Sequence, residues 1–214
     1  MNKAVLTSLG AAGVGGTALG GAILAKNHHN ANSFPRKKYK HALLKLDADE
    51  TIWNSKYSSL QSSAEKPTNS TLASAWSKSK ESGKEIEAKN LLKQGCEEIY
   101  NSHEESKYLK DFKKFCAKTN KDVSTKSNWI TGNNKDTKWN TPLTSLKSYG
   151  EALDPELSGI KNALPQNNSD FDDTHREWLW GWCGDTQQEL FDGIEGTPKL
   201  VNQDTFCVEN QQST

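Results

Sequence analysis

The chain has 214 residues, with 27 basic and 27 acidic side chains, so its formal net charge is zero. This balance removes the electrostatic case for nucleic-acid binding or for a strongly anionic partner. The mean hydropathy is −0.83 and 33% of the residues are apolar, but seven Trp, six Phe and five Tyr supply large side chains. We therefore expect a small folded core with long polar surface segments.

Residues 4–25, AVLTSLGAAGVGGTALGGAILA, contain no charged side chain and lie between Lys3 and Lys26. A helix of this length rises about 1.5 Å per residue and reaches about 33 Å, enough to cross a hydrocarbon core of ~30 Å. We predict that residues 1–26 form a single transmembrane anchor. Two alternatives stay open, namely a cleaved signal peptide and a soluble tail rich in Gly and Ala.

The next segment, residues 27–40, has the composition of a basic polar linker. Its positive charges favour a location of the following chain inside the cell, whereas secretory insertion of a short amino terminus would place it outside. The sequence leaves this orientation open. His28 and His29 are adjacent but have no third ligand nearby, so we predict no metal site there.

The stretch LLKLDADETIWN begins the predicted domain and resembles the nucleophile loop of haloacid-dehalogenase-type phosphatases. In such an enzyme Asp47 would attack phosphorus, Asp49 would act as acid and base, and Asp185 and Glu189 are candidates to hold Mg²⁺. That fold needs buried parallel strands, yet residues 41–214 contain only three Val and six Ile. We favour a helix capped by Asp47, and the phosphatase stays as an alternative function.

Apolar residues at helical spacing predict a mainly α-helical domain over residues 41–214. The clearest pattern covers residues 84–101 and the following segment as far as Cys116. Between the two lies Ser102-x-x-Glu105, a sequence typical of a helix capping box. We predict an α-hairpin here, and further short helices toward the carboxyl terminus.

A second acidic cluster opens a Trp-rich helix, with Thr174-x-x-Glu177 as its predicted capping box. The cluster consists of Asp170, Asp172, Asp173, His175 and Glu177. Such groups can bind a metal, but carboxylates more often favour the positive end of a helix. We predict no catalytic residue, no cofactor and no metal ligand. Trp178, Trp180 and Trp182 cannot all face one side of a helix, so we expect one or two exposed rings, typical of contact surfaces or membrane interfaces.

The four cysteines, at positions 96, 116, 183 and 207, have no C-x-x-C spacing, which argues against a zinc site. An even number suggests two disulfides if the domain lies outside the cell. Three pairings are possible, and Cys96–Cys116 with Cys183–Cys207 is the simplest. In an ideal hairpin, however, Cys96 and Cys116 would be offset by roughly 10 Å. In a cytoplasmic domain the four would be free, mostly buried thiols.

Several features occur together: a Gly/Ala-rich amino-terminal span, the blocks LLKLDADETIWNSKY, YLKDFKKFCAK and REWLWGWC, and a final Cys207. This layout resembles the expanded paralogous families of uncharacterised proteins in haemotropic mycoplasmas. The resemblance implies a membrane-anchored or surface-exposed protein without assigned activity, for which host contact or antigenic diversity is supposed. It supplies no catalytic residues.

We therefore expect a single-pass protein of the cell membrane whose domain lies outside and acts as a non-catalytic interaction protein. Its expected partners are the membrane, through residues 4–25, and a host surface protein. A cytoplasmic, membrane-tethered scaffold is a further alternative, and the oligomeric state is left open.

Overall fold

A computed structural model describes residues 32–167 and 171–209, and it is mainly α-helical, as the sequence predicts. Within these ranges there is no β-strand, and the only β-type pairings are three isolated bridges. The helical elements are α1 Phe34–Lys38, α2 Glu50–Ser62, α3 Ser70–Lys78, α4 Glu85–Tyr100, α5 Glu105–Asp111, the π-helix η1 Phe112–Cys116, α6 Asn120–Val123, the 3₁₀ helix η2 Thr137–Trp139, α7 Asn140–Ser148, α8 Pro155–Ala163, α9 Asp173–Gln188 and α10 Pro198–Phe206.

None of the helices in the described ranges combines the length and the apolar character that a membrane crossing requires. The predicted anchor, residues 4–25, lies outside the described residues. Part of the predicted linker is folded, because α1 occupies residues 34–38. Phe34 at its start is buried and packs edge-on against Phe112, with ring centroids 6.0 Å apart. The folded part therefore begins near residue 33, not at residue 41.

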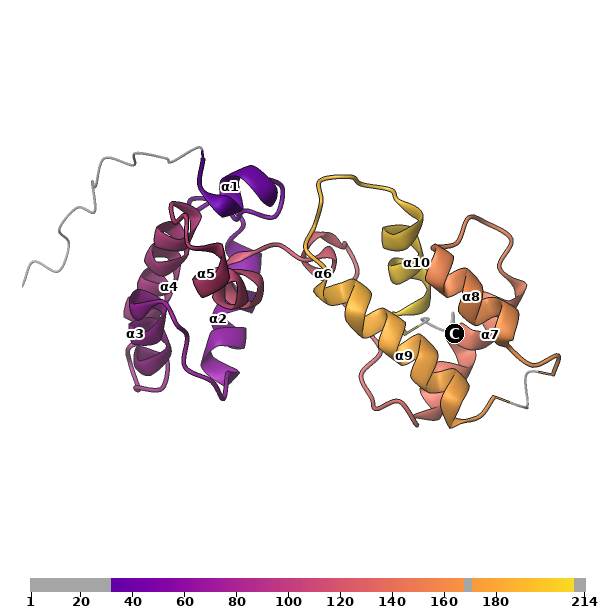
Figure 1. Cartoon of the computed structure of the whole chain (residues 1–214). Helices are drawn as coiled ribbons and strands as arrows, with labels where there is room; N and C mark the ends of the chain where they lie inside the picture. Colours follow the sequence, from indigo (N-terminus) through magenta and orange to yellow (C-terminus); the bar gives the residue numbers. More distant parts are fainter. Residues whose placement is uncertain (1–31, 168–170, 210–214) are drawn as a thin grey trace, which may run out of the picture.

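The buried side chains form two clusters, which divide the folded chain into two lobes (Figure 1). The N-terminal lobe, residues 33–117, contains α1 to α5 and η1 around Trp53, Leu92 and Phe112. The C-terminal lobe, residues 118–209, contains α6 to α10 around Leu143, Trp182 and Phe206. The predicted single domain thus has two hydrophobic cores.

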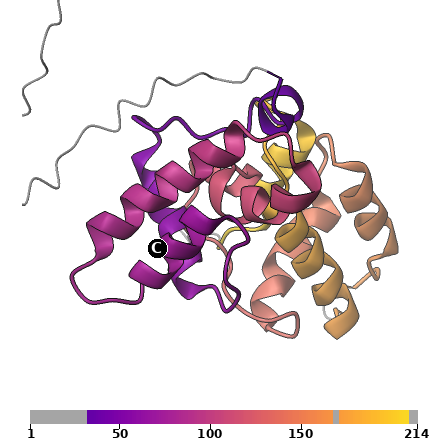
Figure 2. The ribbon, with the colours of Figure 1, turned by 60° about the vertical axis from the view of Figure 1, so that its left-hand side comes forward.

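Helices α3 and α4 lie side by side in the N-terminal lobe (Figures 1 and 2). Their close approach depends on Gly95, since a Cβ atom there would lie 2.8 Å from the Leu72 side chain and 2.9 Å from its backbone nitrogen. Leu72 is fully buried at this contact. The principal helical pair of the lobe is therefore α3 with α4, not the α4–α5 hairpin that the sequence predicts.

The N-terminal lobe also holds a disulfide between Cys96 and Cys116, with Cα atoms 5.2 Å apart. The 10 Å offset expected for a hairpin is absent because η1, and not α5, packs against α4 at this level. The Tyr100 hydroxyl accepts a bond from the N–H of Leu44 at 3.2 Å and donates to the carbonyl of Cys116. Burial raises the pKa of this phenol well above its ordinary value.

In the C-terminal lobe, α9 packs against α7, α8 and α10. The second disulfide joins Cys183 in α9 to Cys207, the residue that follows α10, with Cα atoms 5.6 Å apart. No free cysteine remains in the chain. These are the simplest of the three pairings that the sequence allows.

Polar contacts join the two lobes along residues 118–122. The ammonium of Lys56 in α2 lies 2.6 Å from the carboxylate of Asp122 in α6, and both side chains are less than 10% exposed. The backbone N–H of Lys118 donates to the carbonyl of Ala42 at 2.7 Å, and the Lys118 ammonium pairs with the Asp49 carboxylate at 3.1 Å. The link between the lobes therefore includes a buried ion pair.

Candidate functional site

Helix α9 is the element that carries the most exposed aromatic surface, and its start is fixed by a capping box. The Asp172 carboxylate accepts bonds from the N–H groups of Thr174 at 2.9 Å and His175 at 3.1 Å. The His175 ring reaches back to the backbone N–H of Asp172 at 3.2 Å. The predicted box Thr174–Glu177 is wrong by two residues, because Asp172 has the extended backbone and acceptor side chain that a cap requires.

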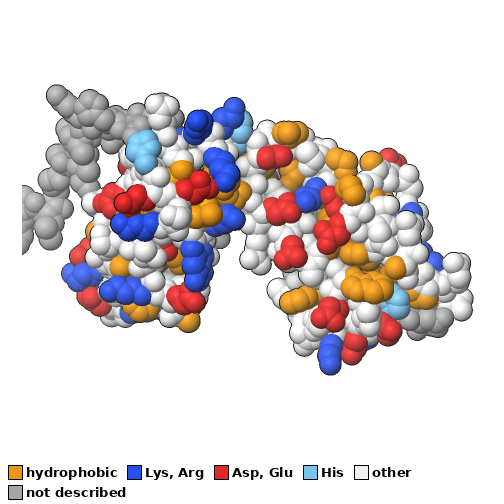
Figure 3. Space-filling view, in the orientation of Figure 1, with side chains coloured by type: hydrophobic (Ala, Val, Ile, Leu, Met, Phe, Trp, Pro, Cys, Tyr) orange, Lys and Arg blue, Asp and Glu red, His pale blue; other side chains and the backbone are white. Residues whose placement is uncertain are grey.

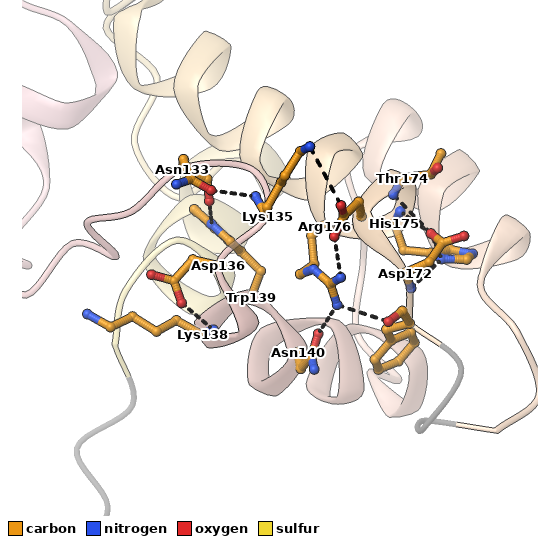
Figure 4. Close-up of polar contacts among 12 residues, drawn as sticks. Asn133, Lys135, Asp136, Lys138, Trp139, Asn140, Asp172, Thr174, His175 and Arg176 are labelled. Carbon is orange, nitrogen blue, oxygen red and sulfur yellow. Dashed lines mark hydrogen bonds and ion pairs between the residues drawn. The ribbon is translucent and has the colours of Figure 1, made fainter.

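A buried arginine ties the first turn of α9 to the rest of the lobe (Figure 4). The Arg176 guanidinium donates to the Phe171 carbonyl at 2.9 Å, to Asn140 at 3.1 Å and to Asp173 at 2.6 Å. Lys135, in the loop before η2, approaches Asp173 at 3.9 Å. Two of the carboxylates of the sequence cluster therefore act within the fold, Asp172 as a cap and Asp173 as a partner of Arg176.

The three Trp side chains of α9 divide as the sequence predicts. Trp182 is buried and its indole N–H donates to Asp154 at 3.2 Å. Trp178 and Trp180 are 40% and 43% exposed, the only two described Trp residues among the exposed large hydrophobics. Trp178 contacts the His175 ring edge-on at 5.3 Å, and the Trp180 N–H donates to the carbonyl of Gly132 at 3.2 Å. Each indole is thus held in place at one edge while much of its ring faces solvent.

Between the two indoles runs a strip of small and acidic residues. At about 100° per residue, Glu177, Gly181 and Gly184 project from the middle of the exposed side of α9, with Trp178 and Trp180 about 160° apart at its borders. A Cβ atom at Gly181 or Gly184 would meet nothing within 4 Å. Packing inside the lobe therefore does not require these glycines, although each costs a helix about 1 kcal/mol relative to Ala.

We call this surface the α9 face and define it as Glu177, Trp178, Trp180, Gly181, Gly184 and Asp185. Figure 3 shows hydrophobic side chains over α9 with acidic side chains beside them. The carboxylates of Glu177 and Asp185 are exposed. Toward its C-terminal end the face reaches a cleft of about 520 Å³ between the lobes, and Tyr39 and Lys113 line the opposite side of that cleft.

The residues of the phosphatase alternative are not brought together. Asp47 lies exposed in a turn, and the helix begins at Glu50, so the predicted cap at Asp47 is wrong. Asp49 precedes the helix in the left-handed conformation, with φ of 55°. Its carboxylate accepts from the Lys45 N–H at 3.0 Å and pairs with Lys118 at 3.1 Å.

Burial raises the pKa of Asp49, but the Lys45 N–H and the Lys118 charge outweigh that effect, and its pKa lies below the ordinary value. Asp49 thus serves a local turn and an ion pair. Asp185 and Glu189, the candidate Mg²⁺ ligands, belong to the other lobe, where Glu189 pairs with Lys199 at 2.9 Å. The parallel sheet that such an enzyme needs is not formed by residues 32–167 and 171–209.

No group of three or more His, Cys, Asp and Glu in the described ranges has the arrangement of a metal site. Asp170, one member of the acidic cluster, lies outside those ranges. His175 acts on Asp172 instead of on a metal, and its hydrogen bonds lower the pKa of that carboxyl. His28 and His29 also lie outside the described residues.

Sequence reasoning missed Arg176 and the two glycines of the strip. Arg176 gives no signal because its partners, Phe171 and Asn140, are recognised only once α7 and α9 are packed together. The glycines could have been recognised from the sequence. Two Gly within a helix of strong apolar periodicity destabilise that helix, which indicates that they serve another role.

Comparisons with family models, with curated proteins and with solved structures give no match for this chain.

Proposed function

We propose that the chain is a membrane-anchored protein that displays residues 33–209 outside the cell and acts as a non-catalytic interaction protein. The observation that carries this proposal is the pairing of all four cysteines, one disulfide in each lobe. Disulfides persist in oxidising surroundings and are rare where cellular reductants keep thiols reduced. The pairing therefore supports an extracellular location over the cytoplasmic scaffold.

The apolar span at residues 4–25 supports the anchor, and the α9 face supports the interaction role. Exposed Trp residues are over-represented at the energetic centres of protein interfaces, since a large, rigid ring buries much area at little entropic cost. The resemblance to haemotropic mycoplasma surface families makes a host surface protein the proposed partner.

Protease shaving of intact cells that express the full chain with a C-terminal tag tests the location. We expect the folded lobes to be removed or clipped before lysis, while a cytoplasmic control protein stays intact. A tag that is protected until the cells are lysed contradicts the proposal and favours the cytoplasmic scaffold.

Labelling of thiols with a maleimide of known mass tests the disulfides in the same cells. Cells are quenched with the reagent before lysis and denaturation, so that disulfides cannot form during handling. We expect no label without reductant and four labels after reduction. Four labels without reductant would contradict the oxidising location, whatever the protease result.

A further inference from the structure

We propose that the α9 face binds an extended, Lys- and Arg-rich segment of a partner protein. This inference rests on the proposed interaction role and names the surface and the chemistry of the partner. The two lobes differ in how often cations of the same chain lie over their aromatic rings.

In the N-terminal lobe, cations of the same chain lie over aromatic rings, and some of these rings are only partly buried. Seven of the eight cation–π contacts among the described residues belong to this lobe, and Lys80 over Trp76 and Lys107 over Tyr108 are examples on partly buried rings. The eighth places Lys121 over Trp129. No described cation lies over Trp178 or Trp180, the two Trp rings with the largest exposure. The α9 face therefore presents ring surface of the kind that cations elsewhere in the chain cover.

The charge of the face also suits a cationic occupant. Residues 118–209 carry 15 acidic and 9 basic side chains, whereas residues 33–117 carry 12 acidic and 16 basic ones. On the exposed side of α9 the charged residues are all acidic, because Arg176, the helix's one Lys or Arg, is buried. A Lys or Arg side chain over either indole lies near Glu177 or Asp185, so ring and carboxylate attract it together.

The glycine strip gives such a segment room to approach. Without Cβ atoms at Gly181 and Gly184, the backbone of a partner can lie close to α9 between the indoles. The flat strip favours an extended segment, whose side chains alternate between its two sides and reach both rings. A glycine pair that the lobe itself does not need thus has a use in contact with a partner.

A second copy of the chain suits the face less well than a foreign segment. Many lysines of the N-terminal lobe already pair with glutamates of the same lobe, for example Lys38 with Glu105. An anionic lipid surface is disfavoured by the carboxylates of the face, which it would repel. A second copy and a lipid surface would each give a distinct result in the binding experiment.

The test measures binding of the purified full chain, in detergent, to a fluorescent nona-arginine peptide at physiological salt. We expect saturable binding and at least a tenfold loss of affinity in the double variant Trp178→Ala/Trp180→Ala, whose net charge is unchanged. Ile194→Ala, which removes an exposed apolar side chain of the same lobe, is the matched control and should bind as the parent does. Equal binding by the Trp double variant would show attraction by charge alone and overturn the proposal.

A second variant separates binding from folding. Gly181→Gln/Gly184→Gln fills the strip with neutral side chains that favour a helix, so the lobe should be at least as stable, yet peptide affinity should fall at least tenfold. Parent-like affinity in this variant would remove the role of the strip and with it the proposed docking mode.

Two further measurements test whether a second copy of the chain or a membrane binds the α9 face instead. Self-association without peptide that the Trp variant abolishes would assign the face to a second copy. Trp-dependent binding of phosphatidylserine in mixed detergent micelles, in place of peptide, would assign it to a membrane, and either result overturns the proposal. Since every arm uses purified protein, failure here is distinct from failure of the surface location, which shaving tests on cells.

Discussion

The two lobes each have a small core, but they differ in how their aromatic rings and glycines are used. Each has one disulfide and one cluster of buried apolar residues. The N-terminal lobe, which is basic, places its own lysines over partly buried rings such as Trp76 and Tyr108, and Gly95 lets two of its helices come into close contact. The C-terminal lobe, which is acidic, leaves two indoles and two glycines open on α9. Aromatic rings and glycines that are covered within the N-terminal lobe thus have exposed counterparts on α9 of the C-terminal lobe.

The ion pair that joins the lobes should contribute more to stability than any other single contact tested by the variants proposed for the two lobes. Lys56→Met leaves the buried Asp122 carboxylate without its cation, which typically costs about 3–5 kcal/mol of stability. Hydrogen exchange should then rise in both α2 and α6, because the pair links them. Met occupies a volume similar to that of the Lys stem, so a cavity is avoided.

The matched control for Lys56→Met is Lys37→Met, at an exposed position of α1, which should change stability little. If Lys56→Met raises exchange in only one lobe, the lobes are independent units and the comparison between them becomes a comparison of two domains.

Removal of one disulfide at a time tests whether each lobe is stabilised by its own crosslink. The paired residues are separated by 20 positions in Cys96–Cys116 and by 24 in Cys183–Cys207. Loops of this length imply a loss of about 3 kcal/mol each by the chain-entropy estimate. We expect the pair variant Cys96→Ala/Cys116→Ala to destabilise mainly the N-terminal lobe, and Cys183→Ala/Cys207→Ala mainly the other. Hydrogen exchange that rises equally in both lobes for either variant would argue for one cooperative unit.

A single type of substitution should have opposite signs in the two lobes. Gly95→Ala places a Cβ atom against the Leu72 backbone and should cost about 2 kcal/mol by overpacking. Gly181→Ala meets no atom and should stabilise the C-terminal lobe by up to about 1 kcal/mol through helix propensity. Urea unfolding of both variants measures the two changes in the free energy of unfolding. Destabilisation by Gly181→Ala would mean that this glycine serves the fold, and would weaken the case for the strip.

The sequence was sufficient for the helical class, the existence of α4 and α9, and the exposure of part of the Trp cluster. Those features follow from the spacing of apolar residues along one helix. Helix starts were misplaced near Asp47, Ser102 and Thr174. At Ser102, for example, the side chain accepts from the Glu104 N–H in a turn, and the helix begins only at Glu105. Side chains such as Ser and Thr support turns as readily as caps, so the choice depends on the surrounding backbone.

Tertiary geometry was the part that local patterns could not supply. The Cys96–Cys116 pair looked offset because a regular hairpin was assumed, whereas η1 brings Cys116 beside α4. The division into two cores depends on which helices pack together, and residues 84–116 alone do not contain that information. The α9 face is recognised only from the period of the helix together with the open space above Gly181.

The smallest expected effects come from two carboxylates whose pKa values move in opposite directions. Burial raises the pKa of Asp111 in the N-terminal lobe above its ordinary value near 3.8, although the Asn69 N–H donates to it. Because the folded state then binds the proton more tightly than the unfolded state, Asp111 favours folding more as the pH falls through that window. In the C-terminal lobe, hydrogen bonds from His175 and Thr174 lower the pKa of Asp172, so its contribution is lost as the pH falls below its ordinary value.

Asn substitutions isolate these two contributions, since Asn keeps an acceptor at each site but does not titrate. Relative to the parent, Asp111→Asn should gain stability as the pH rises from about 4 to 6, because the parent alone loses its bound proton there. Asp172→Asn should gain relative stability as the pH falls from about 4 toward 3, because only the parent loses a charged cap. Urea midpoints of the three proteins across this pH range provide the measurement. If both differences change in the same direction with pH, the two lobes do not hold their carboxylates in the contrasting environments described above.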